Sequence, residues 1–235
     1  MEQSKTGNPI LDGVIWKQIL FFFIPVALGT FFQQMYNTVD ALVVGNAVGM
    51  DALSAVGGAT GSLINLIIGF FVGVASGATV AVAQCYGAGK REEISRVVHT
   101  TAAMSLAAGA MLTVAGILLS PAALRFLNQP EELMADSVLY LRVYFAGMLP
   151  TLIYNVGASI LRAVGDSRRP MIYLIVCCAV NTVLDLLFVA VLKLGVLGAA
   201  LATVLAQVVS ALLVLLRLLR TDDVYRLDLR RIRFH

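Results

Sequence analysis

Charged residues are scarce in this sequence. Only 13% of its 235 residues are Asp, Glu, Lys or Arg, whereas 59% are hydrophobic and the mean hydropathy is +0.88. A soluble domain carries about 25% charged residues, so this chain lacks the polar surface that a globular protein presents to water. The composition predicts a protein solvated by lipid, in which about 20 consecutive apolar residues cross the bilayer.

The sequence has only three cysteines and a small net charge. Cys85, Cys177 and Cys178 lie inside apolar segments, with no CxxC pair and no histidine at ligand spacing, so we interpret them as small apolar side chains. The net charge of +3 comes from short basic blocks between apolar runs and does not indicate nucleic-acid binding. A secretory signal does not explain the first apolar run, 19–44, because it is too long and lacks a cleavage site followed by a polar domain.

Six apolar segments divide the chain, which predicts an all-α, polytopic membrane protein built as a six-transmembrane-helix bundle over 1–220. The expected helices are 18–44, 55–84, 96–120, 136–161, 170–192 and 196–219. Gly87 and Gly89 follow the second segment, and Gly165 and Pro170 separate the fourth from the fifth, as is typical of helix ends and starts. The third segment is expected to end at Ser120, before a proline.

The basic residues predict the orientation of this bundle. With six helices, 14 of the 17 lysines and arginines fall on one side, and the other three are Arg125, Arg142 and Lys193. Because basic residues favour the cytoplasmic side, we expect both termini to be cytoplasmic. Residues 221–235 then form a basic cytoplasmic tail or a linker between lobes, which either lies on the anionic leaflet or is unstructured.

Two further features have structural interpretations. Gly69, Gly73 and Gly77 repeat at intervals of four in the second segment, which predicts close helix packing within the bundle rather than a dimerisation face. His99, near the cytoplasmic start of the third segment, is interpreted as an interfacial residue rather than a proton relay.

Two acids lie well inside apolar segments, Asp40 in the first and Asp185 in the fifth. A charged side chain at the bilayer centre costs at least about 2.5 kcal/mol on insertion scales, and such residues are functional candidates by default. Both helices are expected to run outward from the cytoplasm, so both acids should lie in the outer half of the bilayer. Pro25, in the first segment, can kink its helix and is a candidate hinge or a static bend.

Uncharged polar residues accompany the two acids at helical spacing or on other segments. They are Gln33, Tyr36, Asn37, Asn155, Asn181 and Thr203. If these faces converge, they form a pocket that suits a proton or a sodium ion, because burial favours the neutral acid while amide donors or a cation favour the carboxylate. The alternative is that these groups are only interhelical hydrogen bonds that hold the bundle together.

The chain resembles the N-terminal half of the MATE (multidrug and toxic compound extrusion) transporters, in particular their prokaryotic DinF-like branch. The resemblance rests on five stretches in the family's order: QQMYNTVDALVVGNAVG, GVASGATVAVAQCYGAGKREE, YLRVYFAGMLPTLIYNVGASILRAVGDSRRPM, NTVLDLLF and LGVLGAALATVLAQ. It implies a cation-coupled antiporter of the plasma membrane, not an enzyme, that exports organic, often cationic, drugs and uses no cofactor besides coupling H⁺ or Na⁺.

The resemblance also implies roles and partners. Asp40 and Asp185 would bind the coupling cation, Na⁺ included, with Gln33 as a further supporting member of that site. The helical spacing of Gln33, Tyr36 and Asn37, rather than the resemblance, makes these three candidates for lining the cavity. The supporting cation-site residues would be Asn155, Asn181 and Thr203. The implied partners are a small organic substrate, the lipid bilayer and a second six-helix lobe. That lobe would be another copy of this chain or a missing C-terminal half, because family members have twelve helices around a central cavity.

Three alternative functions differ from this one. One is a non-transporting truncated half or scaffold. Another is a lipid-linked precursor flippase, which usually lines its cavity with basic residues, whereas no Lys or Arg is expected inside the membrane here apart from the peripheral Arg142. An intramembrane aspartyl protease is disfavoured, because Asp40 follows Val39 and Asp185 follows TVL, so neither matches the YD and GxGD patterns of that class.

Overall fold

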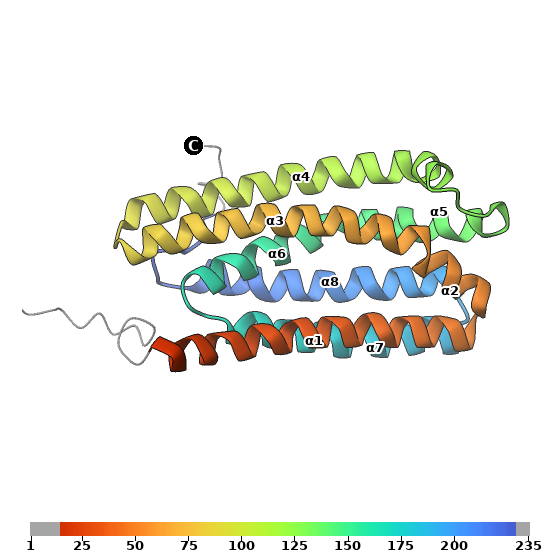
Figure 1. Ribbon diagram of the computed structural model, residues 1–235, viewed down its shortest axis with the longest axis horizontal. Coiled ribbons are helices and arrows are strands. Elements are labelled where there is room, and N and C mark those ends of the chain that lie inside the picture. Colours follow the sequence, from red (N-terminus) through yellow and green to blue (C-terminus); the bar gives the residue numbers. More distant parts are fainter. Residues whose placement is uncertain (1–14, 229–235) are drawn as a thin grey trace, which may run out of the picture.

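Long helices run side by side along the molecule, as Figure 1 shows for the computed structural model, which describes residues 15–228. The elements are α1 (Ile15–Ala47), α2 (Met50–Gly57), α3 (Ala59–Gly87), α4 (Arg91–Phe126), α5 (Glu131–Ala146), α6 (Met148–Ala163), α7 (Arg168–Asp185), the π-helical turn η1 (Leu186–Val191) and α8 (Gly195–Arg220). We call the end where α1 begins and α8 finishes, on the left in Figure 1, the inner end, because the sequence predicts that it faces the cytoplasm. The opposite end is the outer end.

Five helical stretches are long and apolar enough to cross a membrane. They are Ile19–Ala47, Met50–Gly87, Arg91–Phe126, Arg168–Val191 and Gly195–Arg220. The pair α5 and α6 passes the same test as one span bent by 49°. The described residues therefore agree with the predicted all-α six-helix bundle, while the side of the membrane on which the termini lie stays a prediction.

The segment predicted as one helix at 136–161 is instead two helices that meet at Gly147. Pro150 has no amide hydrogen, so it cannot donate to the carbonyl four residues earlier, and this loss favours a bend. Gly147 also lies tightly against α8, since a Cβ there would come within 2.6 Å of Val204 Cγ2. The prediction of a single helix over 136–161 is therefore wrong, although Gly147 and Pro150 together are a sequence signal for a bend.

Two other predicted boundaries differ from the structure. The second span contains a separate short helix, α2, which α3 follows after a break at Gly58. The third span does not end at Ser120, because α4 continues through Pro121 to Phe126. The Ser120 hydroxyl donates to the carbonyl of Gly116, and a side chain from α5 bonds the carbonyl that Pro121 cannot reach.

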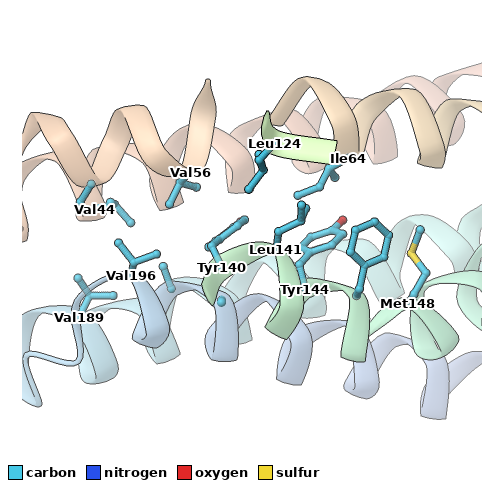
Figure 2. Close-up of a cluster of buried hydrophobic side chains, with 14 residues drawn as sticks. Val44, Val56, Ile64, Leu124, Tyr140, Leu141, Tyr144, Met148, Val189 and Val196 are labelled. Carbon is cyan, nitrogen blue, oxygen red and sulfur yellow. The ribbon is translucent and has the colours of Figure 1, made fainter. Parts of the chain in front are cut away.

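Buried apolar side chains form one cluster in the outer half and another in the inner half of the bundle. Figure 2 shows the outer cluster, in which side chains from α1, α2 and α3 face those from α5, α8 and η1. The inner cluster joins α3, α4, α6, α7 and α8 to the residues after α8. Because helices in lipid gain little from hydrophobic burial, close packing of this kind is what holds a membrane bundle together.

The glycine face of α3 does not pack as the sequence predicts. A Cβ placed on Gly69, Gly73 or Gly77 would meet nothing within 4 Å in the described part of the chain. All three glycines are exposed. The expectation of tight packing within the bundle is therefore wrong, and this small-residue face is open.

Candidate cation site and cavity

The two intramembrane acids lie beside each other. Asp40 is on α1 and Asp185 is the last residue of α7, the helix against which α1 packs. Asp185 is fully buried, Asp40 is 7% exposed, and their carboxyl groups are close enough to interact. Helix packing thus pairs two carboxyl groups that are far apart in the sequence, in a place where both ionised forms would repel each other.

Three other polar side chains surround this pair. Asn181, one turn before Asp185, is fully buried, and Thr203 on α8 is 2% exposed. The Tyr140 hydroxyl on α5 lies beside Thr203 and near both acids. We call these five residues (Asp40, Tyr140, Asn181, Asp185 and Thr203) the acid cluster.

Most polar atoms of the acid cluster have unused hydrogen-bonding capacity. Within the described residues, no partner at hydrogen-bonding geometry exists for Asp40 Oδ1, Asp185 Oδ1 and Oδ2, Asn181 Nδ2 and Oδ1, or Thr203 Oγ1. Buried polar groups are nearly always bonded, and leaving one unbonded costs about 1–3 kcal/mol. A concentration of such atoms at one point is typical of a site that binds something rather than of interhelical bonding alone.

The backbone changes its helical form directly after Asp185. Residues Leu186–Val191 form a π-helical turn, and the amide of Leu192 donates to the carbonyl of Leu187 at 2.8 Å. Single π turns inside α-helices are frequent at functional sites. The sequence offers no signal for this turn, because the residues LLFVAV suit an ordinary α-helix equally well.

A cavity of about 500 Å³ opens next to the acid cluster, between α1, α2, α3, α5, α6 and α8. Its polar lining consists of Gln33, Gln34, Tyr36, Asn37, Asp40, Asn65, Tyr140, Tyr144, Thr151, Asn155 and Gln207. Asp40 is the only acid among the described lining residues, and none of them is Lys or Arg. Asp40 and Tyr140 belong to both the cavity wall and the acid cluster, so they connect the two.

The structure divides the residues singled out from the sequence into two groups. The cavity wall includes Gln33, Tyr36, Asn37 and Asn155. Asn155 donates from Nδ2 to the carbonyl of Thr151 at 2.8 Å and lines the cavity, whereas Asn181, Asp185 and Thr203 do not. The implied role of Asn155 beside the two acids therefore stays a prediction.

Pro25 lies outside both groups. It is buried in the inner half of α1, which continues as a helix on either side of it, and it does not line the cavity. Its position between the inner end of α1 and Asp40 leaves both of the predicted roles open, a hinge and a static kink.

Six polar cavity residues were not identified from the sequence: Gln34, Asn65, Tyr140, Tyr144, Thr151 and Gln207. Tyr140 and Tyr144 stack with ring centroids 6.1 Å apart, Gln207 Nε2 lies 3.5 Å from the Tyr144 hydroxyl, and Thr151 Oγ1 donates to Gln207 Oε1. A signal did exist: the two tyrosines are four residues apart, and Gln207 is four residues after Thr203, so each pair shares a helix face.

The donor set suits a small hard cation or a proton. It offers carboxylate, amide and hydroxyl oxygens, which bind hard cations, and no thiolate or imidazole. No group of three or more His, Cys, Asp or Glu side chains that could hold a metal ion exists among the described residues. Two carboxyl groups with one amide and two hydroxyls can instead share one monovalent cation.

Family-model and sequence comparisons match this chain to known proteins of one kind. The family model described as MatE matches residues 25–187, which is more than half of the chain. The probable multidrug resistance protein YoeA of Bacillus subtilis (strain 168) is 30% identical over 218 residues, covering 91% of this chain and 47% of that protein. The DNA damage-inducible protein F of Escherichia coli (strain K12) is 27% identical over 206 residues, covering 87% of this chain and 44% of that protein.

The fold is similar to that of solved structures. One described as MATE in the bent conformation superimposes with a TM-score of 0.88 at 30% identity, over 98% of this chain and 51% of that one. The chain therefore spans about half the length of the relatives that it matches.

Proposed function

Because this chain belongs to the MATE (multidrug and toxic compound extrusion) transporter family, we propose that it forms one lobe of a cation-coupled exporter of organic cations. Its relatives are multidrug transporters, and it is a multi-pass protein of the plasma membrane. In this proposal the acid cluster binds the coupling ion, H⁺ or Na⁺, and the adjoining cavity binds the exported compound.

One observation carries the proposal: Asp40 belongs to the acid cluster and also lines the cavity. A proton or sodium ion held between Asp40 and Asp185 removes negative charge from the cavity wall. When that ion leaves, Asp40 presents a carboxylate to the cavity and attracts an organic cation. Binding of the ion and of the compound thus oppose each other at one residue, which is the coupling that an antiporter needs.

The proposed substrate class follows from the cavity wall. Without Lys or Arg among its described residues, the wall offers Asp40 as its only formal charge, together with the rings of Tyr36, Tyr140 and Tyr144. Aromatic faces attract cations, so the wall favours a compound that is both cationic and apolar. A lipid-linked phosphate precursor would find no positive charge there, which argues against the flippase alternative.

The proposed partner is a second six-helix lobe. The cavity wall includes Gly69 of α3, and the open glycine face formed by Gly69, Gly73 and Gly77 continues along the same helix. Small residues let two helices approach closely in lipid, so this face can receive a helix of a second lobe and cover the cavity. Pro25 would then allow α1 to bend relative to the rest of the lobe.

Transport of ethidium by the full chain in proteoliposomes tests this function. Under an imposed proton or sodium gradient we expect gradient-dependent ethidium movement for the unaltered chain and background movement for Asp40→Asn and Asp185→Asn. Asp51→Asn is the matched control, because Asp51 is an exposed acid in the first turn of α2 and does not line the cavity. Undiminished transport in both acid variants would refute the assigned ion site, and no transport by the unaltered chain would favour the non-transporting half.

Ion binding can be measured without transport. If Na⁺ is the coupling ion, it should raise the thermal midpoint of the purified chain relative to choline chloride of the same ionic strength, because a ligand that binds only the folded state stabilises it. Asp185→Asn should abolish the increase and Asp51→Asn should keep it. An equal increase in all three proteins would show that sodium acts elsewhere.

A further inference from the structure

The residues that follow α8 do not leave the bundle. The amide of Leu227 donates to the carbonyl of Leu218 at 2.9 Å, so the chain turns back along the last turn of α8. Tyr225 and Leu227 are each 4% exposed and belong to the inner cluster, while Arg226 between them is exposed. Residues 221–228 are therefore docked on the helices, and neither a membrane-surface segment nor an unstructured end describes them. The rest of the predicted tail, 229–235, lies outside the described residues, and a linker between lobes stays a prediction.

A buried histidine receives the end of this segment. His99 on α4 is 2% exposed, and its Nε2 accepts a hydrogen bond from the backbone amide of Asp228 at 3.0 Å. Its Nδ1 lies 2.7 Å from the backbone carbonyl of Ser95. Because an amide only donates and a carbonyl only accepts, the proton must be on Nδ1 and the lone pair on Nε2. The prediction that His99 is an interfacial residue is thus wrong, since both ring nitrogens are used inside the protein.

The docked segment contacts several helices at once. The inner cluster contains Val82 of α3, Val98 of α4, Tyr154 of α6 and Val214 of α8, together with Leu227. None of the described residues of this cluster, buried or partly buried, comes from α1. Tyr173 and Leu174 of α7 are partly buried members of the same cluster. The segment therefore packs in one cluster with α3, α4, α6, α7 and α8, whereas the helix that carries Pro25 and Asp40 contributes no residue to it.

We propose that residues 221–228 are a strap that holds the inner ends of α3, α4, α6, α7 and α8 together as one body, and that the hydrogen bond to His99 fastens it. The strap ties the end of α8 to the start of α4 through the Asp228–His99 hydrogen bond and fills the space between the helices with Tyr225 and Leu227. At the inner end of the lobe, α1 is then the helix that can move relative to the others, because the strap does not hold it. This inference goes beyond the transport function, because it concerns which helices can move and does not depend on the ion or the compound.

Trypsin digestion of the full chain in lipid nanodiscs tests the hydrogen bond to His99. The Arg226–Leu227 bond can be cleaved only when the strap opens, because Leu227 is buried while the Arg226 side chain is exposed. Asp228→Pro removes the amide hydrogen that His99 accepts, and we expect cleavage at this bond to be about tenfold faster. Asp228→Ala is the matched control, since it removes the same carboxylate and keeps the amide. Equal cleavage rates in these two variants would overturn the role of the hydrogen bond.

Hydrogen exchange in the same nanodiscs tests the clamping. In His99→Ala we expect faster exchange in the strap and also in the inner turns of α4 and α8, with α1 unchanged. Ser95→Ala should exchange like the unaltered chain, because His99 Nδ1 bonds the Ser95 carbonyl and not chiefly its hydroxyl, which is 3.4 Å away. If only the strap exchanges faster, the strap does not hold the helices; if α1 also exchanges faster, the proposed division between the clamped body and α1 is wrong. Should His99→Ala fail to fold, the comparison of Asp228→Pro with Asp228→Ala supplies the same measurement.

Discussion

Arg142 on α5 donates from Nε to the backbone carbonyl of Ile117 on α4 at 3.2 Å. In an unbroken α-helix that carbonyl would accept from the amide of residue 121, but residue 121 is a proline and has no amide hydrogen. The arginine supplies the missing donor from a neighbouring helix. This replacement explains how α4 continues past Pro121 to Phe126 near the outer end.

This contact leads to a double-mutant prediction. Arg142→Met should lower the free energy of unfolding by about 1 kcal/mol, because the Ile117 carbonyl loses its donor. In a Pro121→Ala background the same change should cost less, since the introduced alanine has an amide hydrogen that restores the helical bond. Equilibrium unfolding of the four proteins in mixed detergent micelles gives the coupling. Arg125→Met, at an exposed position in the last turn of α4, is the control, and an equal cost of Arg142→Met in both backgrounds would contradict the explanation.

Glycines in the bundle should respond in opposite ways to alanine. A Cβ on Gly116 would lie 2.1 Å from Phe145 Cγ, so Gly116→Ala forces α4 and α5 apart and should cost about 1–3 kcal/mol of unfolding free energy. A Cβ on Gly73 would meet nothing within 4 Å, and Gly73→Ala should be neutral or stabilising by up to about 1 kcal/mol, because alanine favours the helix. The same unfolding assay checks both, and similar costs would contradict the packing at Gly116.

A buried hydroxyl connects α5 to α2 at the outer end. Gln129 Nε2 donates to Ser137 Oγ at 2.7 Å, and Ser137 Oγ donates to the carbonyl of Ala55 at 3.1 Å. Ser137→Ala leaves both partners without this bond inside the protein and should lower the thermal midpoint, with a loss of about 1–3 kcal/mol. Ser62→Ala removes an exposed hydroxyl that bonds only to the backbone four residues before it and should change little. Equal midpoints in the two variants would contradict a role of this link in stability.

The open face of α3 predicts an effect on pairing without an effect on folding. Gly73→Leu should leave the unfolding of the single lobe unchanged, because a Cβ at that position would meet no other part of the described chain within 4 Å. It should reduce chemical cross-linking between copies of the chain in membranes, because a large side chain keeps a partner helix away. Unchanged cross-linking in Gly73→Leu would mean that copies meet through another face, and no cross-linking of the unaltered chain would mean that a second copy is not the partner.

The acid cluster could be predicted only in part. Asp40 and Asp185 were identifiable singly, because a carboxyl group in an apolar run is costly wherever its helix packs. Their adjacency depends on the contact between α1 and α7, which hydropathy does not encode. The same holds for Asn155: its polarity marked it as a candidate, but only the packing of α6 decides that it lines the cavity and donates to the carbonyl of Thr151.

Hydrogen bonds between distant residues account for the remaining differences. Pro121 signals a helix end when only local bonds are considered, but Arg142 replaces the lost donor from another helix. His99 looks interfacial from its place near a helix start, but the amide of Asp228 reaches it after the chain has turned back. In both cases a local rule was overruled by a partner far away in the sequence.

The amino-acid sequence by itself determined that the chain spans a membrane, that it does so with six apolar segments, and that two acids lie within them. It could do so because lipid solvates no free backbone or charged group. Long apolar helices are therefore required, and a charged residue within one is easily recognised in the sequence. Only the tertiary structure decided that Asp40 meets Asp185, that α5 and α6 bend at Gly147, and that the tail docks on His99. These outcomes depend on which helix faces touch, and in lipid those faces are selected by shape and by individual hydrogen bonds rather than by the hydrophobic pattern.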